Sequence, residues 1–333
     1  MTFESKNLLS ANDSPSNGLN FAQTVLEGLS LEQKCLPSWP LFDDRGSEIF
    51  KKITWLKGYP PAECEFEIIG KNKKFITDML PEKNFRLIEL GSGDGEKAKI
   101  LIKTLIGEGR PVHYVPIDIT ERALKSLVAS LESEFSGTTL KVTGLIADFF
   151  QGLDAVVKQS KQSNLVLFLG ATLGNMAFEE MQKFLRKLNQ ALNYGDHVMI
   201  GFDLMKHPKQ LYAAYNDSQG LFEEFNLYML DRINKELDGN FNKENFVQEA
   251  QYNPNTRAVE SYVYSTCEQT VRVGALDREF KFKAWEKMRT ELSYKYTEEE
   301  IDALAVNSGF EIIGHLYEAG RQYVMPVWKA GGE

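Results

Sequence analysis

The sequence predicts an α/β protein with a doubly wound, mainly parallel sheet and a second, smaller α+β domain. Short apolar segments alternate with amphipathic helical patterns between residues 85 and 203. A glycine-rich turn follows the first of these apolar segments. After residue 203 the alternation stops, and a long helical pattern precedes two runs with a period of two. A helix between two strands returns the chain to the same end of the sheet, so this alternation predicts parallel strands joined by right-handed crossovers.

The individual elements follow from the spacing of their apolar residues. In the alternating part we expect strands at Phe85–Leu90, His113–Ile117, Leu140–Ala147, Asn164–Leu169 and His197–Asp203, and helices at Lys97–Leu105, Glu121–Phe135, Gly152–Ser160 and Phe178–Leu192. Before it, helices are expected at Ser47–Ile53 and Cys64–Asp78.

The remainder of the chain carries different signals. A helix is expected at Leu221–Gly239, with Gly239 as its C-cap, and a curled antiparallel hairpin is expected from Ala258–Val273 and Arg278–Tyr296. Thr297 and Glu300 have the spacing of a capping box at the start of a helix. Two strands around the Ala319-Gly320 turn end the chain.

These patterns divide the chain into two domains. We expect one discontinuous domain from residues 64–204 and 296–333, and a smaller domain from residues 20–63 and 205–295. Residues 1–19 are rich in Ser, Asn and Asp, and we expect them to be flexible.

Composition excludes several classes of function. The 333 residues include 43% hydrophobic and 26% charged residues, and a net charge of −9 argues against a nucleic-acid or anionic-membrane partner. Three widely separated cysteines are typical of a reducing compartment, and four scattered histidines predict no metal site. The polar N-terminus predicts no signal peptide, and no apolar run is long enough to span a membrane. We therefore expect a cytoplasmic protein, either a monomer or a weak dimer.

The segment from Arg86 to Leu105, RLIELGSGDGEKAKILIKTL, carries the first functional signal. Glycines between a strand and a helix let the backbone approach a ligand, and the helix N-terminus offers amide donors. Asp118 ends the next strand, where a ribose diol needs a carboxylate. Asp148 and Phe149 come after the following strand. This pair can hydrogen-bond to the edge of an adenine and pack on its face. A plain strand-to-helix turn is the alternative interpretation of the glycines alone.

The spacing of the glycines indicates which nucleoside is bound. A dinucleotide fingerprint has its third glycine three residues after the second, whereas Gly95 follows Gly93 by only two. The run from Glu89 to Gly93 resembles motif I of the class I S-adenosylmethionine-dependent methyltransferases. The two-strand tail after Gly309 resembles the reversed C-terminal β-hairpin of their Rossmann-like fold. This resemblance implies S-adenosyl-L-methionine as cofactor and S-adenosyl-L-homocysteine as product, with NAD(P) as a distant alternative.

Five further segments extend the resemblance over nearly the whole chain, from Leu36 to Lys329. They are LFDDRGSEIFKKITWLKGYPPAE, FLGATLGNM, GFDLMKHPKQLYAAYND, STCEQTVRV and MRTELSYKY. Together they resemble the histidine Nα-methyltransferases of ergothioneine biosynthesis, whose relatives in fungi act on tryptophan-derived amines. The resemblance implies a small-molecule amino-acid substrate and trimethylation of the α-amine of L-histidine to a betaine.

The resemblance also implies the residues of the site. Asn175 and Tyr215 would contact the substrate carboxylate and amine, with Tyr59 near the same group, and these three would be the catalytic residues. Glu291 and Ser293, two apart on a strand and so on one face, would hold an imidazole, while Phe50 and Ser261 would line the pocket. The cofactor residues would be Gly91, Lys97, Asp118, Asp148, Phe149 and Gly170.

Two positions depart from the family pattern. The chain has Phe42 where the histidine enzymes carry a tyrosine, and Ser261 where they carry a methionine. The first change removes a hydroxyl near the substrate amine, and the second makes the pocket wall smaller and more polar. An N-methyltransferase of another aromatic amino acid or of a tryptophan-derived amine therefore stays open, as does a non-catalytic homologue that only binds S-adenosylmethionine.

Overall fold

The chain divides into two units, which the computed structural model describes for residues 2–9, 18–158 and 160–331. The first unit is Met1–Ser10, Pro61–Met205 and Tyr296–Glu333, and the second is Ala11–Pro60 and Lys206–Lys295. The chain passes from one unit to the other next to Pro61, Met205 and Tyr296.

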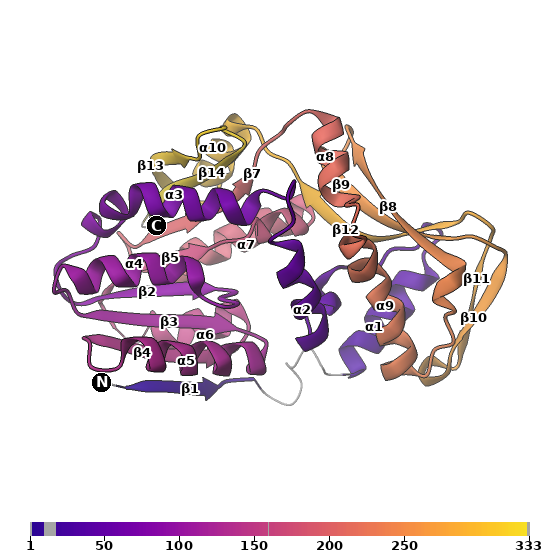
Figure 1. Ribbon diagram of the computed structural model, residues 1–333, viewed down its shortest axis with the longest axis horizontal. Helices are drawn as coiled ribbons and strands as arrows, with labels where there is room; N and C mark the ends of the chain where they lie inside the picture. Colours follow the sequence, from indigo (N-terminus) through magenta and orange to yellow (C-terminus); the bar gives the residue numbers. More distant parts are fainter. Residues whose placement is uncertain (1, 10–17, 159, 332–333) are drawn as a thin grey trace. The chain divides into compact units, whose positions relative to one another are not determined.

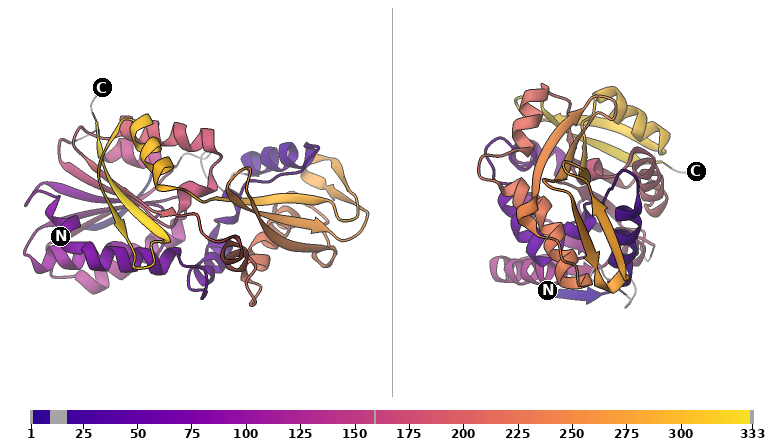
Figure 2. Two further views of the ribbon diagram at one scale, coloured as in Figure 1. Left: turned by 90° about the horizontal axis from the view of Figure 1, so that it is seen from above. Right: turned by 90° about the vertical axis from the view of Figure 1, so that its right-hand side faces the viewer.

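The first unit is built on one mainly parallel sheet with helices on both faces (Figure 1; Figure 2, left). The strand order is β1-β4-β3-β2-β5-β6-β14-β13, with the short strand β7 also paired to β14. The strands are β1 (Phe3–Asn7), β2 (Phe85–Leu90), β3 (Val112–Asp118), β4 (Leu140–Ile146), β5 (Ser163–Phe168), β6 (His197–Ile200), β7 (Phe202–Asp203), β13 (Phe310–Tyr317) and β14 (Tyr323–Ala330).

Strand pairing confirms the predicted fold class. β2 is parallel to β3 and β5, whereas β14 is antiparallel to β6 and to β13, so the C-terminal hairpin enters the sheet in the reverse direction. The sheet is flanked by α3 (Pro61–Asp78), α4 (Glu96–Gly107), α5 (Glu121–Phe135), α6 (Phe149–Val156), α7 (Phe178–Ala191) and α10 (Glu298–Asn307). β2 is buried along its whole length, including its two charged residues Arg86 and Glu89, and its other four residues are apolar.

The core of this unit contains side chains from both the sheet and its helices. Leu87 of β2 and Tyr114 of β3 are fully buried and pack with Leu101 of α4 and Leu131 of α5. Burying a large apolar side chain contributes roughly 1.5–3 kcal/mol. This packing fixes the sheet as a rigid support for the loops at its edge.

The second unit combines helices with antiparallel strands. Its helices are α1 (Gly18–Ser30), α2 (Asp44–Ile53), α8 (Pro208–Tyr215) and α9 (Leu221–Leu237). β8 (Phe246–Asn253), β9 (Ala258–Ser265) and β12 (Lys287–Tyr294) form one sheet in the order β12-β9-β8, and β10 (Gln269–Val273) pairs with β11 (Arg278–Phe282). Pairing of β9 with β12 and of β10 with β11 confirms the predicted curled hairpin.

Four local expectations are wrong. Phe3–Asn7 is not flexible but forms the edge strand β1, parallel to β4; its residues are mostly exposed, so the sequence carries no apolar pattern there. Residues 10–17 of that expectation lie outside the described part of the chain. Helix α6 begins at Phe149 rather than at Gly152, because Asp148 caps it. The strand expected from residue 197 to 203 breaks at Gly201, and Asp238, not Gly239, is the left-handed C-cap of α9.

Candidate active site

The glycine turn joins β2 to α4 in the first unit. Gly91, Gly93 and Gly95 have φ values of 69°, 52° and 66°, a left-handed conformation that residues with a Cβ adopt at a cost. A Cβ at Gly95 would also lie 2.6 Å from Leu127 Cδ1. The turn therefore requires glycine, and it presents backbone amides at the N-terminus of α4.

Asp118 connects this turn to the end of β3. Its carboxylate accepts hydrogen bonds from the Gly93 amide at 3.1 Å and from the Thr120 amide at 2.9 Å. Burial raises the pKa of Asp118, while these two amides oppose the rise. The carboxylate is thus held beside the glycine turn, where a diol can donate to it.

Asp148 and Phe149 stand at the end of β4 and the start of α6. Asp148 Oδ1 accepts from the Phe150 and Gln151 amides at 2.8 Å and 3.0 Å, and Gln151 completes the capping box. The Phe149 ring lies next to Gly91, 3.8 Å from the position that a Cβ would occupy there. The Phe149 ring thus borders the glycine turn, and the Asp148 carboxylate belongs to the residue directly before it.

Lys97 belongs to a polar cluster around Glu65, a buried residue of α3 that the sequence analysis missed. Glu65 forms an ion pair with Lys97 and accepts from the Gly170 amide at 2.7 Å and from the Tyr323 hydroxyl at 2.6 Å. A Cβ at Gly201, between β6 and β7, would collide with both Glu65 and Tyr323, so this position requires glycine. Glu65 thereby holds Lys97 and the loop after β5 in place.

Gly170 and Asn175 are the remaining predicted site residues of the first unit. Gly170 follows β5 with a φ of 80°, and Asn175 ends the short helix η2 (Thr172–Asn175) with its side chain half-buried. Asn175 is not among the described residues with positive φ, so it does not serve as a left-handed turn residue. Gly91, Asp118, Asp148 and Gly170 follow four adjacent parallel strands and share one edge of the sheet.

A second buried acid, Glu89, lies in β2 immediately before the turn. It accepts a hydrogen bond from the Tyr114 hydroxyl. Burial raises the pKa of Glu89 to about 8, although Tyr114 and Lys97 both favour its ionised form. The sequence identifies Glu89 as part of motif I but gives no sign of its partner, because Tyr114 is 25 residues away.

The second unit holds the remaining predicted residues. Tyr59 and Tyr215 are buried, and their rings meet edge to face with centroids 5.6 Å apart. Phe222 of α9 packs on both, at 5.3 Å and 4.9 Å. The two phenols predicted to contact the substrate are thus neighbours.

A separate aromatic group surrounds Phe50. The rings of Phe42, Phe50 and Phe225 lie 5.2–5.6 Å apart and all three pairs are in contact. Phe42, one of the two departures from the family pattern, therefore packs against the predicted pocket residue Phe50.

Glu291 is buried on β12 in a network of neutral polar groups. Its Oε2 accepts from Ser261 Oγ at 3.3 Å, and Asn226 of α9 bonds to the same carboxylate. Thr290 Oγ1 donates to Asn226 Oδ1 at 2.6 Å. Burial raises the pKa of Glu291 to about 7, against the opposing effects of Asn226, Ser261 and Lys295. A carboxylate in this setting is a specific acceptor for an N–H group.

Ser293 takes part in a different group from Glu291. Its hydroxyl is 2.7 Å from the Tyr215 hydroxyl, and the fully buried Lys295 Nζ donates to both oxygens at 2.8 Å. Glu291, Ser293 and Lys295 are all buried while the residues between them are half-exposed, so the three share one face of the chain.

Helix α9 brings the groups of this unit together. Phe222 contacts the two tyrosines, Phe225 contacts the phenylalanines, and Asn226 reaches Glu291. Sequence reasoning missed Phe222, Phe225, Asn226 and Lys295. The available signal was a polar Asn226 inside the apolar face of a predicted helix, and Lys295 two residues beyond Ser293 on the same face.

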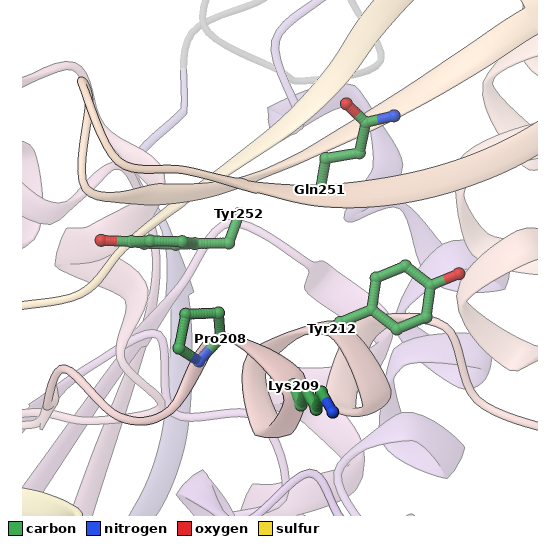
Figure 3. A pocket seen from close by; sticks show the side chains of 5 residues that line it. All are labelled: Pro208, Lys209, Tyr212, Gln251 and Tyr252. Carbon is green, nitrogen blue, oxygen red and sulfur yellow. The ribbon is translucent and has the colours of Figure 1, made fainter.

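An open depression elsewhere on this unit contains none of the predicted residues. Figure 3 shows it between Pro208, Lys209 and Tyr212 of α8 and Gln251 and Tyr252 of β8. Tyr212 is half-exposed and donates to Glu249, whereas Tyr215 one turn later is buried in the candidate site. Burial thus changes along α8, and its C-terminal residue Tyr215 is the buried one.

Among the described residues no group of three or more His, Cys, Asp or Glu side chains could hold a metal ion. In the same part of the chain no helix is both long and apolar enough to cross a membrane.

The sequence is similar to one family of known proteins over most of its length. The profile of a family described as "Histidine-specific methyltransferase, SAM-dependent" matches residues 21–330. Histidine N-alpha-methyltransferase of Mycobacterium tuberculosis is 32% identical over 89% of this chain and 90% of its own length. The protein of the same name from Mycolicibacterium smegmatis is 32% identical over 93% and 94%. Ergothioneine biosynthesis protein 1 of Schizosaccharomyces pombe is 28% identical over 85% of this chain but only 37% of its own length.

Proposed function

This chain belongs to the family of histidine-specific, S-adenosylmethionine-dependent methyltransferases, and we propose that it methylates the α-amine of L-histidine three times to yield a betaine. The observation that most supports histidine as the substrate is the buried network around Glu291. Few amino-acid side chains offer an N–H donor to such a carboxylate on a ring that aromatic residues can surround.

The first unit supplies residues that fit the cofactor. The glycine turn leaves room for the nucleoside, Asp118 would accept from its ribose diol, and Asp148 with Phe149 would bind its adenine. Lys97, held by Glu65, would pair with the carboxylate of its methionine part. The bound cofactor supplies an electrophilic methyl group on a sulfonium.

For this reaction the protein must mainly position the substrate amine and favour its neutral form. An α-amine with a pKa near 8 is largely protonated at neutral pH, so a proton must leave before each transfer. We assign Asn175 to orienting the amine through its amide oxygen, and Tyr59 and Tyr215 to relaying the proton from the amine to solvent. Their aromatic faces also tolerate the growing cationic charge as methyl groups accumulate.

Exclusion of water is the second contribution of these residues. Tyr59 and Tyr215 are 7% and 2% exposed, so the amine they contact would be largely desolvated. Desolvation favours the neutral amine, because burial penalises the charged form. It also strengthens every hydrogen bond that orients the nucleophile.

Substitution of Glu291 tests the assignment of the imidazole. Glu291→Gln removes the negative charge and should weaken histidine binding about 10–100-fold, the range for losing a charge-assisted hydrogen bond. Glu260→Gln is a matched control: Glu260 is equally buried on the neighbouring strand but bonds to Tyr262 and Thr256 instead. Steady-state kinetics with histidine measure both variants. Equal KM values for the two variants would exclude an imidazole at Glu291.

A second substrate class is favoured by one observation. Ser261 is a small, polar neighbour of Glu291 and leaves more room than the methionine of the histidine enzymes. A larger aromatic amino acid, or an amine derived from tryptophan, is therefore the alternative substrate. For such a substrate Glu291→Ala should barely alter turnover. Binding of S-adenosylhomocysteine with no product from any amine would indicate a non-catalytic homologue.

A further inference from the structure

Glu65 of α3 is fully buried, and each of its two carboxylate oxygens has its own partners. Oε1 accepts hydrogen bonds from the Gly170 amide at 2.7 Å and from the Tyr323 hydroxyl at 2.6 Å. Oε2 pairs with the Lys97 ammonium. A buried carboxylate is costly unless charged or polar groups surround it, and these three partners compensate the burial of Glu65.

The ion pair has one buried and one accessible partner. The side chain of Glu65 is 0% exposed, whereas that of Lys97 is 21% exposed. Lys97 lies in the first turn of α4, directly after the glycine turn. Glu65 is therefore shielded from a bound ligand, but it can act on one through Lys97.

Two partners of Glu65 are predicted cofactor residues. Lys97 is the residue that we assign to the carboxylate of the methionine part of the cofactor. Gly170 follows β5 at the edge of the sheet that carries the glycine turn. One buried carboxylate thus holds a side chain and a backbone amide of the candidate cofactor site.

Fixing Lys97 before the ligand arrives favours binding. A lysine side chain loses much rotamer freedom when it is ordered, which is one reason why exposed ion pairs contribute little to affinity or stability. Glu65 already orders Lys97, and Glu65 is itself confined by the Tyr323 hydroxyl and by Gly201, where a Cβ would collide with it. The loss of rotamer freedom therefore occurs on folding and not on binding.

We propose that Glu65 is a positioning residue of the cofactor site, which fixes Lys97 and the Gly170 amide and thereby makes the protein select nucleosides that carry an amino-acid part. The proposal rests on the assignment of Lys97 within the proposed function. It does not depend on which amine is methylated.

Two adenosine thioethers distinguish this effect from a general loss of the site. S-adenosylhomocysteine carries the amino-acid part, and methylthioadenosine has a methyl group in its place. Calorimetry on the whole chain measures their dissociation constants. Lys97→Met should weaken binding of S-adenosylhomocysteine about 10–100-fold, the range for a lost charge-assisted hydrogen bond, and change binding of methylthioadenosine less than about twofold.

Glu65→Gln should reproduce the pattern of Lys97→Met. The amide keeps an oxygen for the Gly170 amide and the Tyr323 hydroxyl but removes the negative charge that holds Lys97. Binding of S-adenosylhomocysteine should weaken about 5–50-fold, and binding of methylthioadenosine should stay within about twofold of wild type. The double variant should lose no more affinity than Lys97→Met alone, because Glu65 acts through Lys97.

Glu67→Gln is the matched control. Glu67 lies on the same helix, pairs with Lys71 and accepts from the Ala319 amide, so both affinities should equal those of wild type. Methylthioadenosine binding also reports whether a variant is folded. If Glu65→Gln is not folded, Glu65→Asp takes its place, because the shorter side chain keeps the charge but withdraws it from Lys97.

Three results would overturn the proposal. Equal losses for the two thioethers in Glu65→Gln would make Glu65 a purely structural residue. Unchanged or tighter binding of S-adenosylhomocysteine in that variant would mean that Glu65 competes with the cofactor for Lys97. Equal losses, or none, in Lys97→Met would contradict the assignment of Lys97 in the proposed function as well, whereas a selective loss in Lys97→Met alone would contradict only the role of Glu65.

Discussion

Burial raises the pKa of two glutamates at the candidate sites into the neutral pH range. The pKa of Glu89 is raised to about 8 and that of Glu291 to about 7, and each is bonded to a hydroxyl. Glu89 lies beside the glycine turn, and Glu291 lies in the network with Asn226. Because functional sites are where strongly shifted carboxyl groups concentrate, both shifts support the positions assigned to the sites.

Because of Glu89, the free energy of unfolding should decrease as the pH rises. Its pKa in the folded protein is above the unfolded value of about 4.5, so its stabilising protonated form is fully present below pH 4.5 and is lost as the pH rises to about 8. Glu89→Gln keeps an acceptor for Tyr114 without a charge. The variant should match wild type at pH 4.5 and exceed it by about 2–4 kcal/mol at pH 8.5.

Unfolding in urea at the two pH values measures this difference in the free energy of unfolding. The ligand-free protein is required, because cofactor binding would add its own stabilisation. A Glu89→Gln variant that is less stable than wild type by the same amount at both pH values would show that Glu89 is ionised in the fold.

At the scale of single elements, the N-terminus of helix α6 combines a structural role with a proposed binding role. Asp148 caps the helix through Oδ1, so Oδ2 is the oxygen that would accept from the adenine amino group. Sequence reasoning assigned Asp148 to adenine but began the helix three residues late, because it did not consider Asp148 and Gln151 as a capping pair. Asp148 thus caps the helix whose first residue, Phe149, contacts the glycine turn at Gly91.

Substitutions of Asp148 separate these two roles. Asp148→Asn should keep the cap and the stability, because asparagine caps helices as well as aspartate does, but should weaken binding of S-adenosylhomocysteine. Asp148→Ala should lose about 1 kcal/mol of stability as well. Chemical denaturation and calorimetry distinguish the outcomes. Unchanged S-adenosylhomocysteine affinity in both variants would remove Asp148 from the cofactor site.

Elements that bury an apolar face were predictable, and those that do not were missed. β2 is mostly apolar and α5 has periodic apolar residues, and both were expected at their observed bounds. β1 is an exposed edge strand, and Lys295 is a buried charge. Neither leaves an apolar pattern in the sequence. Contacts such as Glu65 with Lys97, Gly170 and Tyr323 join four distant segments, and no local pattern records them.

At the scale of the whole molecule, the two sets of residues fall into separate units. The glycine turn, Asp118, Asp148 and Asn175 belong to the first unit, and Tyr59, Tyr215 and Glu291 belong to the second. We therefore expect Glu291→Gln and Lys295→Met to bind S-adenosylhomocysteine within about twofold of wild type, because neither residue belongs to the unit that holds the proposed cofactor residues. Calorimetric titration checks this. A loss of about tenfold would mean that the second unit contributes directly to cofactor binding.

Methyl transfer to histidine is tested most directly by incubating the protein and S-adenosylmethionine with a panel of amino acids and amines, followed by mass spectrometry of the products. The panel should include histidine, tryptophan, phenylalanine, histamine and tryptamine. We predict a product only from histidine, with the mass of three added methyl groups. A methylated product from tryptophan or tryptamine but not from histidine, or a histidine product that stops at one methyl group, would contradict the proposed function.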